Sequence, residues 1–237
     1  VGLVALWEAA VWAFSVPDWL VPPPTQIAGV IIEKNIVILQ HAWVTLFETV
    51  AGFVLALVGG VIIGVGIVHA PILRDTLYPA LIMFNSFPKI ALAPLFVIWM
   101  GVGLESKIAN AFLVAFFPIV INTILGLTAM DPEMLELVRA MTRSRWTLFW
   151  KIRLPFSLPY LFAACKIAVS LAVIGAIVGE WISGRSGLGY LVLAANTYFN
   201  TSLAFAALIY MVVISLMLYG LVVLAEKLLL PWYRGGT

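Results

Sequence analysis

Apolar runs of about 20 residues recur along this chain, and they limit its possible folds more than any other feature. A helix of about 20 apolar residues is long enough to cross a hydrocarbon core of about 30 Å. Hydrophobic residues make up 64% of the 237 residues and charged residues 10%, against roughly 25% charged in soluble domains. The sequence therefore predicts an all-α, polytopic membrane protein.

The apolar runs fit about six transmembrane helices, which we place at 1–16, 42–69, 76–101, 106–128, 158–183 and 202–228. We expect residues 1–40 to form the first helix and an external loop, 41–230 a core domain and 231–237 a tail. The chain begins without Met or a positively charged leader, which we interpret as a trimmed start and not as a signal peptide.

Lys and Arg residues gather on one side of the predicted spans. That side holds eight of them: Arg74, Arg139, Arg143, Arg145, Lys151, Arg153, Lys227 and Arg234. The other side holds Lys34, Lys107 and Arg185. Because the excess marks the cytoplasmic side, we expect a protein of the inner (plasma) membrane, its C-terminus in the cytoplasm and, with six spans, its N-terminus too.

The remaining composition excludes other classes of protein. A net charge of +2 without a basic patch gives no reason to expect nucleic acid. Cys165 is a single cysteine, and His41 and His69 are not spaced as ligands, so neither a disulfide nor a metal site is predicted. Residues 179–186 approach a phosphate-binding loop, but an apolar helix precedes them and Arg185 replaces its Lys, so we reject nucleotide binding by this chain.

One internal segment, 131–155, is charged throughout its length, with five of the thirteen basic and three of the eleven acidic residues. Asp131 and Pro132 predict a helix start, as N-cap and first helical residue. Ser144 predicts the cap of a second short helix rich in aromatic residues, which Leu154 and Pro155 would end. Pattern alone leaves three interpretations open: a helix at the lipid interface, a docking helix for a soluble partner, and an enzyme site, which lacks a catalytic set of residues.

Residues along nearly the whole chain resemble a known family. The spacing from Glu136 to Pro155 resembles the "EAA" loop of ABC importer permeases, with Thr142 where that family usually has Gly. Segments 86–101, 116–126 and 179–189 are similar to further parts of the same domain. Within the family, the chain most resembles importers of nitrate, taurine, alkanesulfonates, bicarbonate and pyrimidine vitamin precursors, and SFPKIALAPL inclines us to the last group.

The resemblance implies a type I ABC importer transmembrane domain that is not itself an enzyme. Its loop would form coupling helices seated on a dimer of cytoplasmic ATPases, which would bind ATP and Mg, so that no cofactor is expected in this chain. Further partners would be an external solute-binding protein, a second permease copy, in a homodimer, and membrane lipids. The residues so assigned to coupling are Glu136, Arg139, Ala140, Thr142, Ser144, Trp146, Phe149, Leu154 and Pro155. Thr142 implies a different bend between the helices, because Gly alone readily takes positive φ.

Ionisable residues within spans are functional candidates, because a buried charge is costly in a membrane. They are Glu48, Lys89, Lys166 and Glu180. Lys89 follows Pro88, so we expect a broken, polar helix lining a cavity there. A structural pair of Glu48 with Lys89 or Lys166 is the alternative. We assign to a translocation pathway Asn85, Ser86, Lys89, Asn122, Ser170 and Glu180.

Two questions stay open at this point. The glycine pairs Gly60–Gly64 and Gly175–Gly179, with Gly52 and Gly66, predict close helix packing within one bundle, or a face for dimerisation or sliding. An ion-coupled secondary transporter is the alternative function, although no inverted repeat of broken helices is visible. A membrane enzyme is less favoured, because no catalytic constellation accompanies the loop.

Overall fold

The computed structural model describes residues 2–141 and 144–232, and within these ranges every regular element is a helix. The all-α prediction is therefore confirmed. The elements are α1 (Gly2–Ala13), α2 (Pro24–Glu33), α3 (Asn35–His69), α4 (Pro71–Asn85), η1 (Lys89–Leu92), α5 (Ala93–Met100), α6 (Leu104–Thr128), α7 (Pro132–Met141), α8 (Arg145–Leu148), the π-helical η2 (Phe149–Arg153), α9 (Leu154–Ser183), α10 (Leu188–Thr197) and α11 (Thr201–Leu229).

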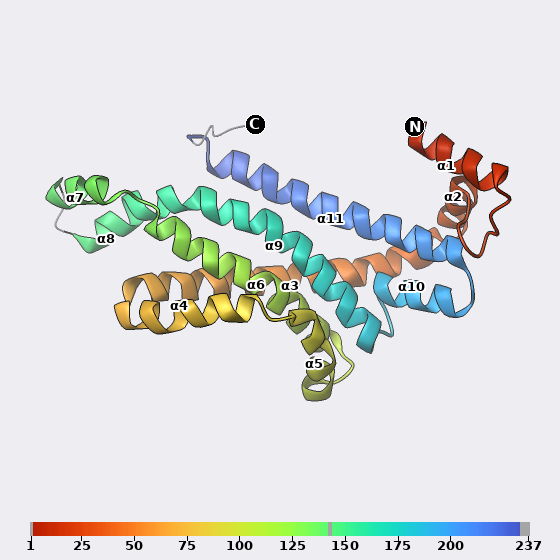
Figure 1. Ribbon diagram of the computed structural model, residues 1–237, viewed down its shortest axis with the longest axis horizontal. Coiled ribbons are helices and arrows are strands. Elements are labelled where there is room, and N and C mark those ends of the chain that lie inside the picture. The colour runs from red at the N-terminus through yellow and green to blue at the C-terminus, as the bar shows by residue number, and fades with distance from the viewer. Residues whose placement is uncertain (1, 142–143, 233–237) are drawn as a thin grey trace.

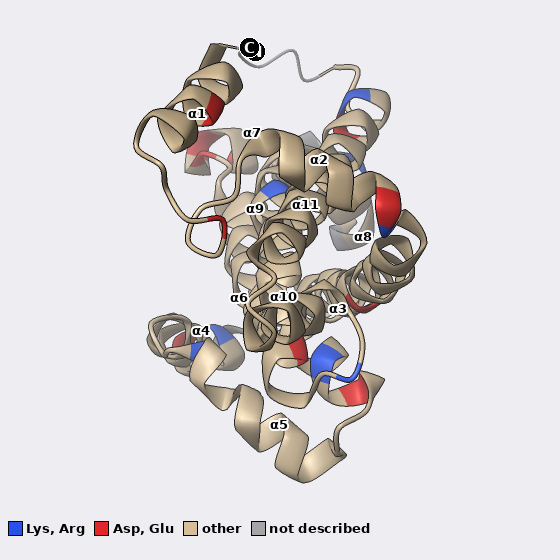
Figure 2. Cartoon of the chain, turned by 90° about the vertical axis from the view of Figure 1, so that its right-hand side faces the viewer, with Lys and Arg blue, Asp and Glu red and all other residues tan. Residues whose placement is uncertain are grey.

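Four helical runs among the described residues are long and apolar enough to cross a membrane. They are α3, α6, the joined run Trp146–Ser183, and α11. Figure 1 shows them running along the long axis of the molecule, with α7 and α8 at one end and α10 at the other. Viewed from the end that carries α10, most of the ribbon is uncharged (Figure 2).

The span expected at 76–101 is a broken pair of helices and not one continuous helix. Residues 72–85 and 89–100 meet at an angle of 88°. Pro88 disfavours α-helical conformation in the preceding Phe87, and it has no N–H to continue the ladder. The break predicted around Lys89 is thus confirmed.

The N-terminal region differs from the six predicted spans. α1 has 12 residues, about 18 Å at 1.5 Å per residue, which is too short to cross the hydrocarbon core. The stretch expected to be a loop at 17–40 contains α2 and the first turns of α3. Pro24 begins α2 at a position where the missing N–H of proline costs nothing. The Glu8 carboxylate on α1 accepts hydrogen bonds from the Thr25 N and Oγ1 of α2, at 3.1 and 2.7 Å.

α6 lies against both α3 and α9, and small side chains form the contact. The buried cluster between the three helices consists of Ala56, Ala111, Ala115, Ile119, Ala168, Ala172 and Ala176. A Cβ placed on Gly52 would lie 2.5 Å from the Ala111 Cβ, and one on Gly175 would lie 2.7 Å from the Ala111 Cα. The glycines therefore serve helix packing inside this bundle, except Gly66, which has no atom within 4 Å of such a Cβ.

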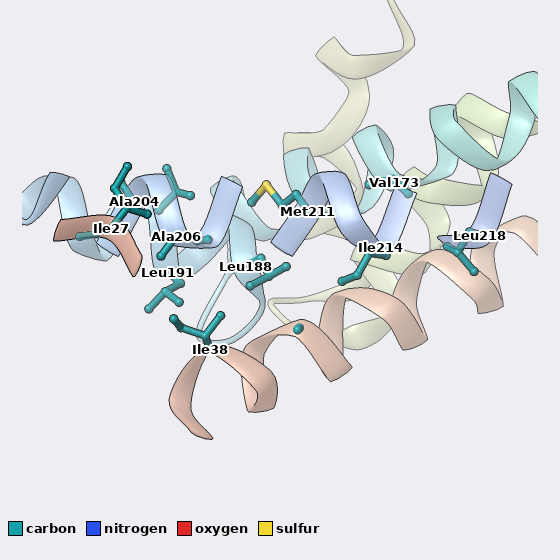
Figure 3. Packing of buried hydrophobic residues seen from close by; sticks show 14 of the residues in the cluster. Ile27, Ile38, Val173, Leu188, Leu191, Ala204, Ala206, Met211, Ile214 and Leu218 are labelled. Atoms are coloured by element: carbon teal, nitrogen blue, oxygen red, sulfur yellow. The ribbon is translucent and has the colours of Figure 1, made fainter. Parts of the chain in front are cut away.

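A second core joins α2, α3, α9, α10 and α11 near the end that carries α10. Its buried side chains include Ile27, Ile38, Val173, Leu188, Met211 and Ile214, which are spread along α11 in Figure 3. This core fixes α10 and the loop that precedes it against α3, and so positions the buried polar groups described below.

Candidate functional site

The first helix of the charged loop begins as predicted. α7 starts at Pro132, and the Leu135 N donates to the Asp131 O at 3.0 Å. Glu136 and Ala140 are exposed on it, whereas Val138 is buried. Met134 and Leu137 are also exposed, at 50% and 63%, so most of the described surface of α7 is open to a partner. Thr142 and Arg143 lie outside the described residues, as do the side chains of Arg139 and Arg145.

Ser144 caps the second helix, as its position predicted. The Thr147 N donates to the Ser144 Oγ at 3.3 Å, and the Leu148 N donates to the Ser144 O at 3.0 Å. A side-chain oxygen at an N-cap satisfies an otherwise unpaired backbone donor. This hydrogen bond fixes where α8 begins.

Aromatic side chains of α8 and η2 form one packed group. The Trp146 ring lies 5.4 Å from the Trp150 ring, and the Phe149 ring contacts Trp150 at 5.5 Å. Phe149 also meets His69, at the end of α3, edge-on at 5.0 Å. Trp146 is 71% exposed and borders a hollow whose other lining residues include Val65, His69 and Phe149. The loop thus presents a large apolar side chain outward while it stays anchored to α3.

Leu154 and Pro155 do not end the second helix, which corrects the sequence prediction. α8, η2 and α9 form one helical run from Trp146 to Ser183. The intervening turn is π-helical, with the Leu154 N donating to the Phe149 O. Pro155 lies at the start of α9, where its only defect is the missing backbone N–H. In an α-helix its pyrrolidine ring would collide with the carbonyl four residues earlier, and the wider π turn before it makes room for that ring. The loop is consequently a direct extension of a transmembrane helix.

A polar group lies at the bend between α4 and α5. The Lys89 Nζ donates to the Asn85 O at 2.8 Å and the Asn85 Oδ1 at 2.9 Å. The same Nζ lies 4.9 Å from the centre of the Phe117 ring on α6. Lys89 is half-buried, and Asn85 is exposed. An ammonium group is thus held at a broken helix by neutral partners.

The other residues assigned to the pathway do not converge on Lys89. Ser86 is exposed next to it and donates to the Ile82 O at 3.4 Å. Asn122 is half-buried and donates to the Pro118 O of its own helix at 2.9 Å. Ser170 is half-buried on α9. Glu180 has no exposed surface and belongs to a separate buried cluster.

That buried cluster joins α3, α6, α9 and the loop before α10. The Lys107 Nζ binds the Glu48 Oε1 at 2.8 Å, and both side chains are almost completely buried. Glu180 accepts from the Thr45 Oγ1 and from the Gly189 N, each at 2.6 Å. The structural pair expected for Glu48 therefore exists, but its partner is Lys107 and not Lys89 or Lys166.

Lys166 has a different partner from the expected Glu48. Its Nζ lies 2.5 Å from the Glu226 Oε2 on α11, and both side chains are partly exposed. The pair joins α9 to the last turns of α11, so it serves helix packing near the end that carries α7 and α8.

Sequence reasoning missed Thr45, His41 and Lys107 as members of the buried cluster. The His41 Nδ1 accepts from the Gly187 N at 3.0 Å, and the Thr45 Oγ1 accepts from the Leu188 N at 2.8 Å. His41, Thr45 and Glu48 follow each other at helical spacing of three to four residues. That spacing is a signal for one polar stripe on α3, which a search for isolated charges overlooks.

Comparison with known proteins places this architecture in a class of membrane transporters. Residues 56–230 match the family described as "Binding-protein-dependent transport system inner membrane component", and the chain belongs to it. It is therefore the membrane-spanning permease subunit of an ABC importer.

Two relatives and one solved structure illustrate the similarity. A riboflavin transport system permease protein of Chloroflexus aurantiacus is 36% identical, over 97% of this chain and 87% of its own length. A formylaminopyrimidine transport permease protein of Halalkalibacterium halodurans is 33% identical, over 98% and 93%. A structure of inward-facing conformations of the MetNI methionine ABC transporter matches with a TM-score of 0.70 and 21% identity, over 82% of this chain and 97% of that one. This likeness supports the type I importer fold.

Proposed function

We propose that this permease carries a small heteroaromatic vitamin precursor inward, driven by a cytoplasmic ATPase dimer on which α7, α8 and η2 are seated. A second copy of the chain completes the pathway, and an external solute-binding protein delivers the substrate. ATP and Mg belong to the ATPase partner.

The exposed Trp146 at the tip of a continuous helix is the observation that supports this coupling most. Its large apolar surface is unburied in the chain alone, and exposed aromatic residues are frequent anchors of protein interfaces. Because α8 continues through η2 into α9, a displacement at Trp146 moves the cytoplasmic end of a transmembrane helix. The Phe149–His69 contact ties the same movement to α3.

The heteroaromatic class is supported by two independent observations. Two relatives are named as permeases for heteroaromatic compounds, one for riboflavin and one for formylaminopyrimidine. At the bend between α4 and α5, the Lys89 ammonium group and the Phe117 aromatic ring lie next to each other. Those groups suit a ring system with acceptor atoms. A thermal-shift screen of the binding protein against riboflavin, formylaminopyrimidine and taurine tests this class, and stabilisation by taurine alone would contradict it.

The coupling proposal is tested by the variant Trp146→Ala in the complete transporter. Loss of an aromatic anchor at an interface costs about 2 kcal/mol or more, about thirtyfold in affinity, so we expect much weaker co-purification with the ATPase and little substrate-stimulated ATP hydrolysis. Trp43→Ala is the matched control, because Trp43 is 69% exposed on α3, away from the loop. Glu136→Ala, on the exposed face of α7, should act in the same direction.

Normal association and transport in both loop variants would contradict the coupling proposal. Transport that continues after ATP depletion, supported by an ion gradient, would favour the secondary transporter instead.

A further inference from the structure

Three ionisable side chains of the buried cluster lie together where α3, α6 and α9 cross, and they are almost completely shielded from solvent. Glu48 and Glu180 are 0% exposed, and Lys107 is 3% exposed. The Lys107 Nζ binds one oxygen of Glu48 at 2.8 Å and the Ser186 O at 3.3 Å. The Thr45 Oγ1 donates to the Glu180 Oε1 at 2.6 Å, and Thr45 lies three residues before Glu48 on α3, so both carboxyl groups lie at the same point of the α3–α9 crossing.

The charges of this cluster do not balance if both carboxyl groups are ionised. Lys107 compensates one of them. His41 adds no charge, because its Nδ1 accepts a hydrogen bond from the Gly187 N and so carries no proton. Tyr190, whose ring contacts that of His41, carries no charge at neutral pH, and the side chain of Arg185, in the loop before α10, is exposed. Among the described residues, the second carboxylate would then have neutral donors but no cation to pair with, which is strongly unfavourable for a buried charge.

The hydrogen bonds of the cluster leave one position open. Glu180 receives the Thr45 hydroxyl on Oε1 and the Gly189 N–H on Oε2. Glu48 receives Lys107 on Oε1, while its buried Oε2 has no donor among the described residues. Two ionised carboxylates cannot hydrogen-bond to each other, since both only accept. A single proton between them removes the excess charge and satisfies the Oε2 of Glu48.

We propose that Glu48 and Glu180 bind one shared proton at neutral pH, forming a proton site at the crossing of α3, α6 and α9. The site goes beyond the transport function and does not depend on its substrate or ATPase.

The loop before α10 and the first turn of α10 close over the proton site. A Cβ on Gly187 or Gly189 would collide with the Glu180 carboxyl group, so this loop is folded tightly over the site. The N–H of Gly187 and those of the first two residues of α10 donate to His41, Thr45 and Glu180, respectively. Removing the proton would set two like charges against each other beneath the loop, and would loosen the α3–α9 contact.

Infrared spectroscopy of the purified chain in detergent tests the proposal. We expect the carbonyl stretch of a protonated carboxylic acid at neutral pH, shifted in D2O, and lost in both Glu48→Gln and Glu180→Gln. Glu180→Gln should fold, because glutamine has the shape of a protonated glutamate and its amide can donate to Glu48. Glu33→Gln, on an exposed site, and Glu226→Gln, in the pair with Lys166, should keep the band.

A pH series supplies a second readout. The unfolded chain releases this proton at neutral pH, because an exposed glutamate ionises near pH 4. The folded state therefore binds one proton more, and its stability falls as the pH rises. We expect the melting temperature of the native protein to fall from weakly acidic to weakly alkaline pH, and this fall to be reduced in Glu180→Gln.

Absence of the acid band from the native protein at neutral pH would overturn the proposal, whether or not any variant folds. A band that survives both Gln variants would do the same. So would stabilisation of the native protein by sodium that is absent in Glu48→Gln, because a bound cation would then compensate the second carboxylate.

Discussion

At the scale of single residues, polar side chains in the membrane divide into two kinds. Lys107 and Glu180 are buried and bound by several groups of the chain itself. Lys89 is only half-buried and binds neutral groups, the carbonyl oxygens of Asn85 and the ring of Phe117. Because no carboxylate pairs with it among the described residues, the Lys89 ammonium group can still bind an acceptor group of a substrate. A charged residue within a span is costly to keep and is therefore a functional candidate.

Replacing Lys89 should therefore reduce transport without disturbing assembly. A hydrogen bond from a charged group contributes about 1.5–3 kcal/mol, so we expect Lys89→Gln to lower substrate import into proteoliposomes about tenfold or more. Lys89→Arg, which keeps the charge, should retain most of the rate. Lys227→Gln is the control, because Lys227 is exposed in the last turns of α11. Unchanged import by Lys89→Gln would remove Lys89 from the pathway.

The sequence predicted which residues are charged and membrane-embedded, but not how they pair. Glu48 and Lys107 are 59 positions apart, and they meet because Gly52 lets α3 approach α6, where a Cβ on that glycine would lie 3.1 Å from the Ile108 O, next to Lys107. Apolar periodicity identifies each helix and says little about which helices cross where. Local signals were more informative: Pro132 and Ser144 begin their helices as predicted.

At the scale of helices, the contact of α6 with α9 depends on backbone proximity. A Cβ on Gly175 would meet the Ala111 Cα at 2.7 Å and the Asn110 O at 2.9 Å. Both are backbone atoms that cannot rotate away. Asn110 also donates to the Gly175 O at 2.6 Å, so any separation of the two helices breaks a buried hydrogen bond.

Gly175→Ala should destabilise the bundle for this reason. Overpacking of a tight interface costs about 1–3 kcal/mol, which should appear as a lower melting temperature in detergent. Gly66→Ala is matched in chemistry, but its added methyl meets no atom within 4 Å. That change should be neutral or stabilise by up to about 1 kcal/mol, because Ala is the better helix former. Equal melting temperatures in the two variants would contradict the assigned packing.

The prediction that Pro155 ends the second helix of the loop was wrong for a reason that lies in how the helices join. A proline within a helical pattern usually marks a boundary, and this expectation separated the loop from the following span. Here the proline occupies the first turn of α9, and the π turn before it absorbs the change of register. The charged loop and the transmembrane helix are consequently one mechanical unit, which no local rule distinguishes from two short helices.

At the scale of the whole molecule, the structure increases the difference in basic residues between the two ends of the bundle, from which the orientation in the membrane is predicted. Lys107 counted among the charges of the side opposite the loop, but its ammonium group is buried against Glu48. In the count from the sequence, Lys34 and Arg185 then remain on that side, against eight basic residues on the side predicted for the charged loop. Figure 1 places α10 at the far end of the molecule from these two helices. From the positive-inside rule we therefore propose that the loop lies in the cytoplasm and α10 outside.

Cysteine labelling of intact cells measures this orientation directly. In a Cys165→Ser background, which removes the one native thiol, Ser144→Cys reports on the loop and Asn196→Cys on the end of α10; both positions are exposed. A membrane-impermeant maleimide should label Asn196→Cys in intact cells, and Ser144→Cys only after the cells are permeabilised. The reverse pattern would place the aromatic tip of the loop outside the cell, out of reach of any cytoplasmic ATPase. Labelling of both sites in intact cells would show that the long axis of the bundle does not cross the membrane.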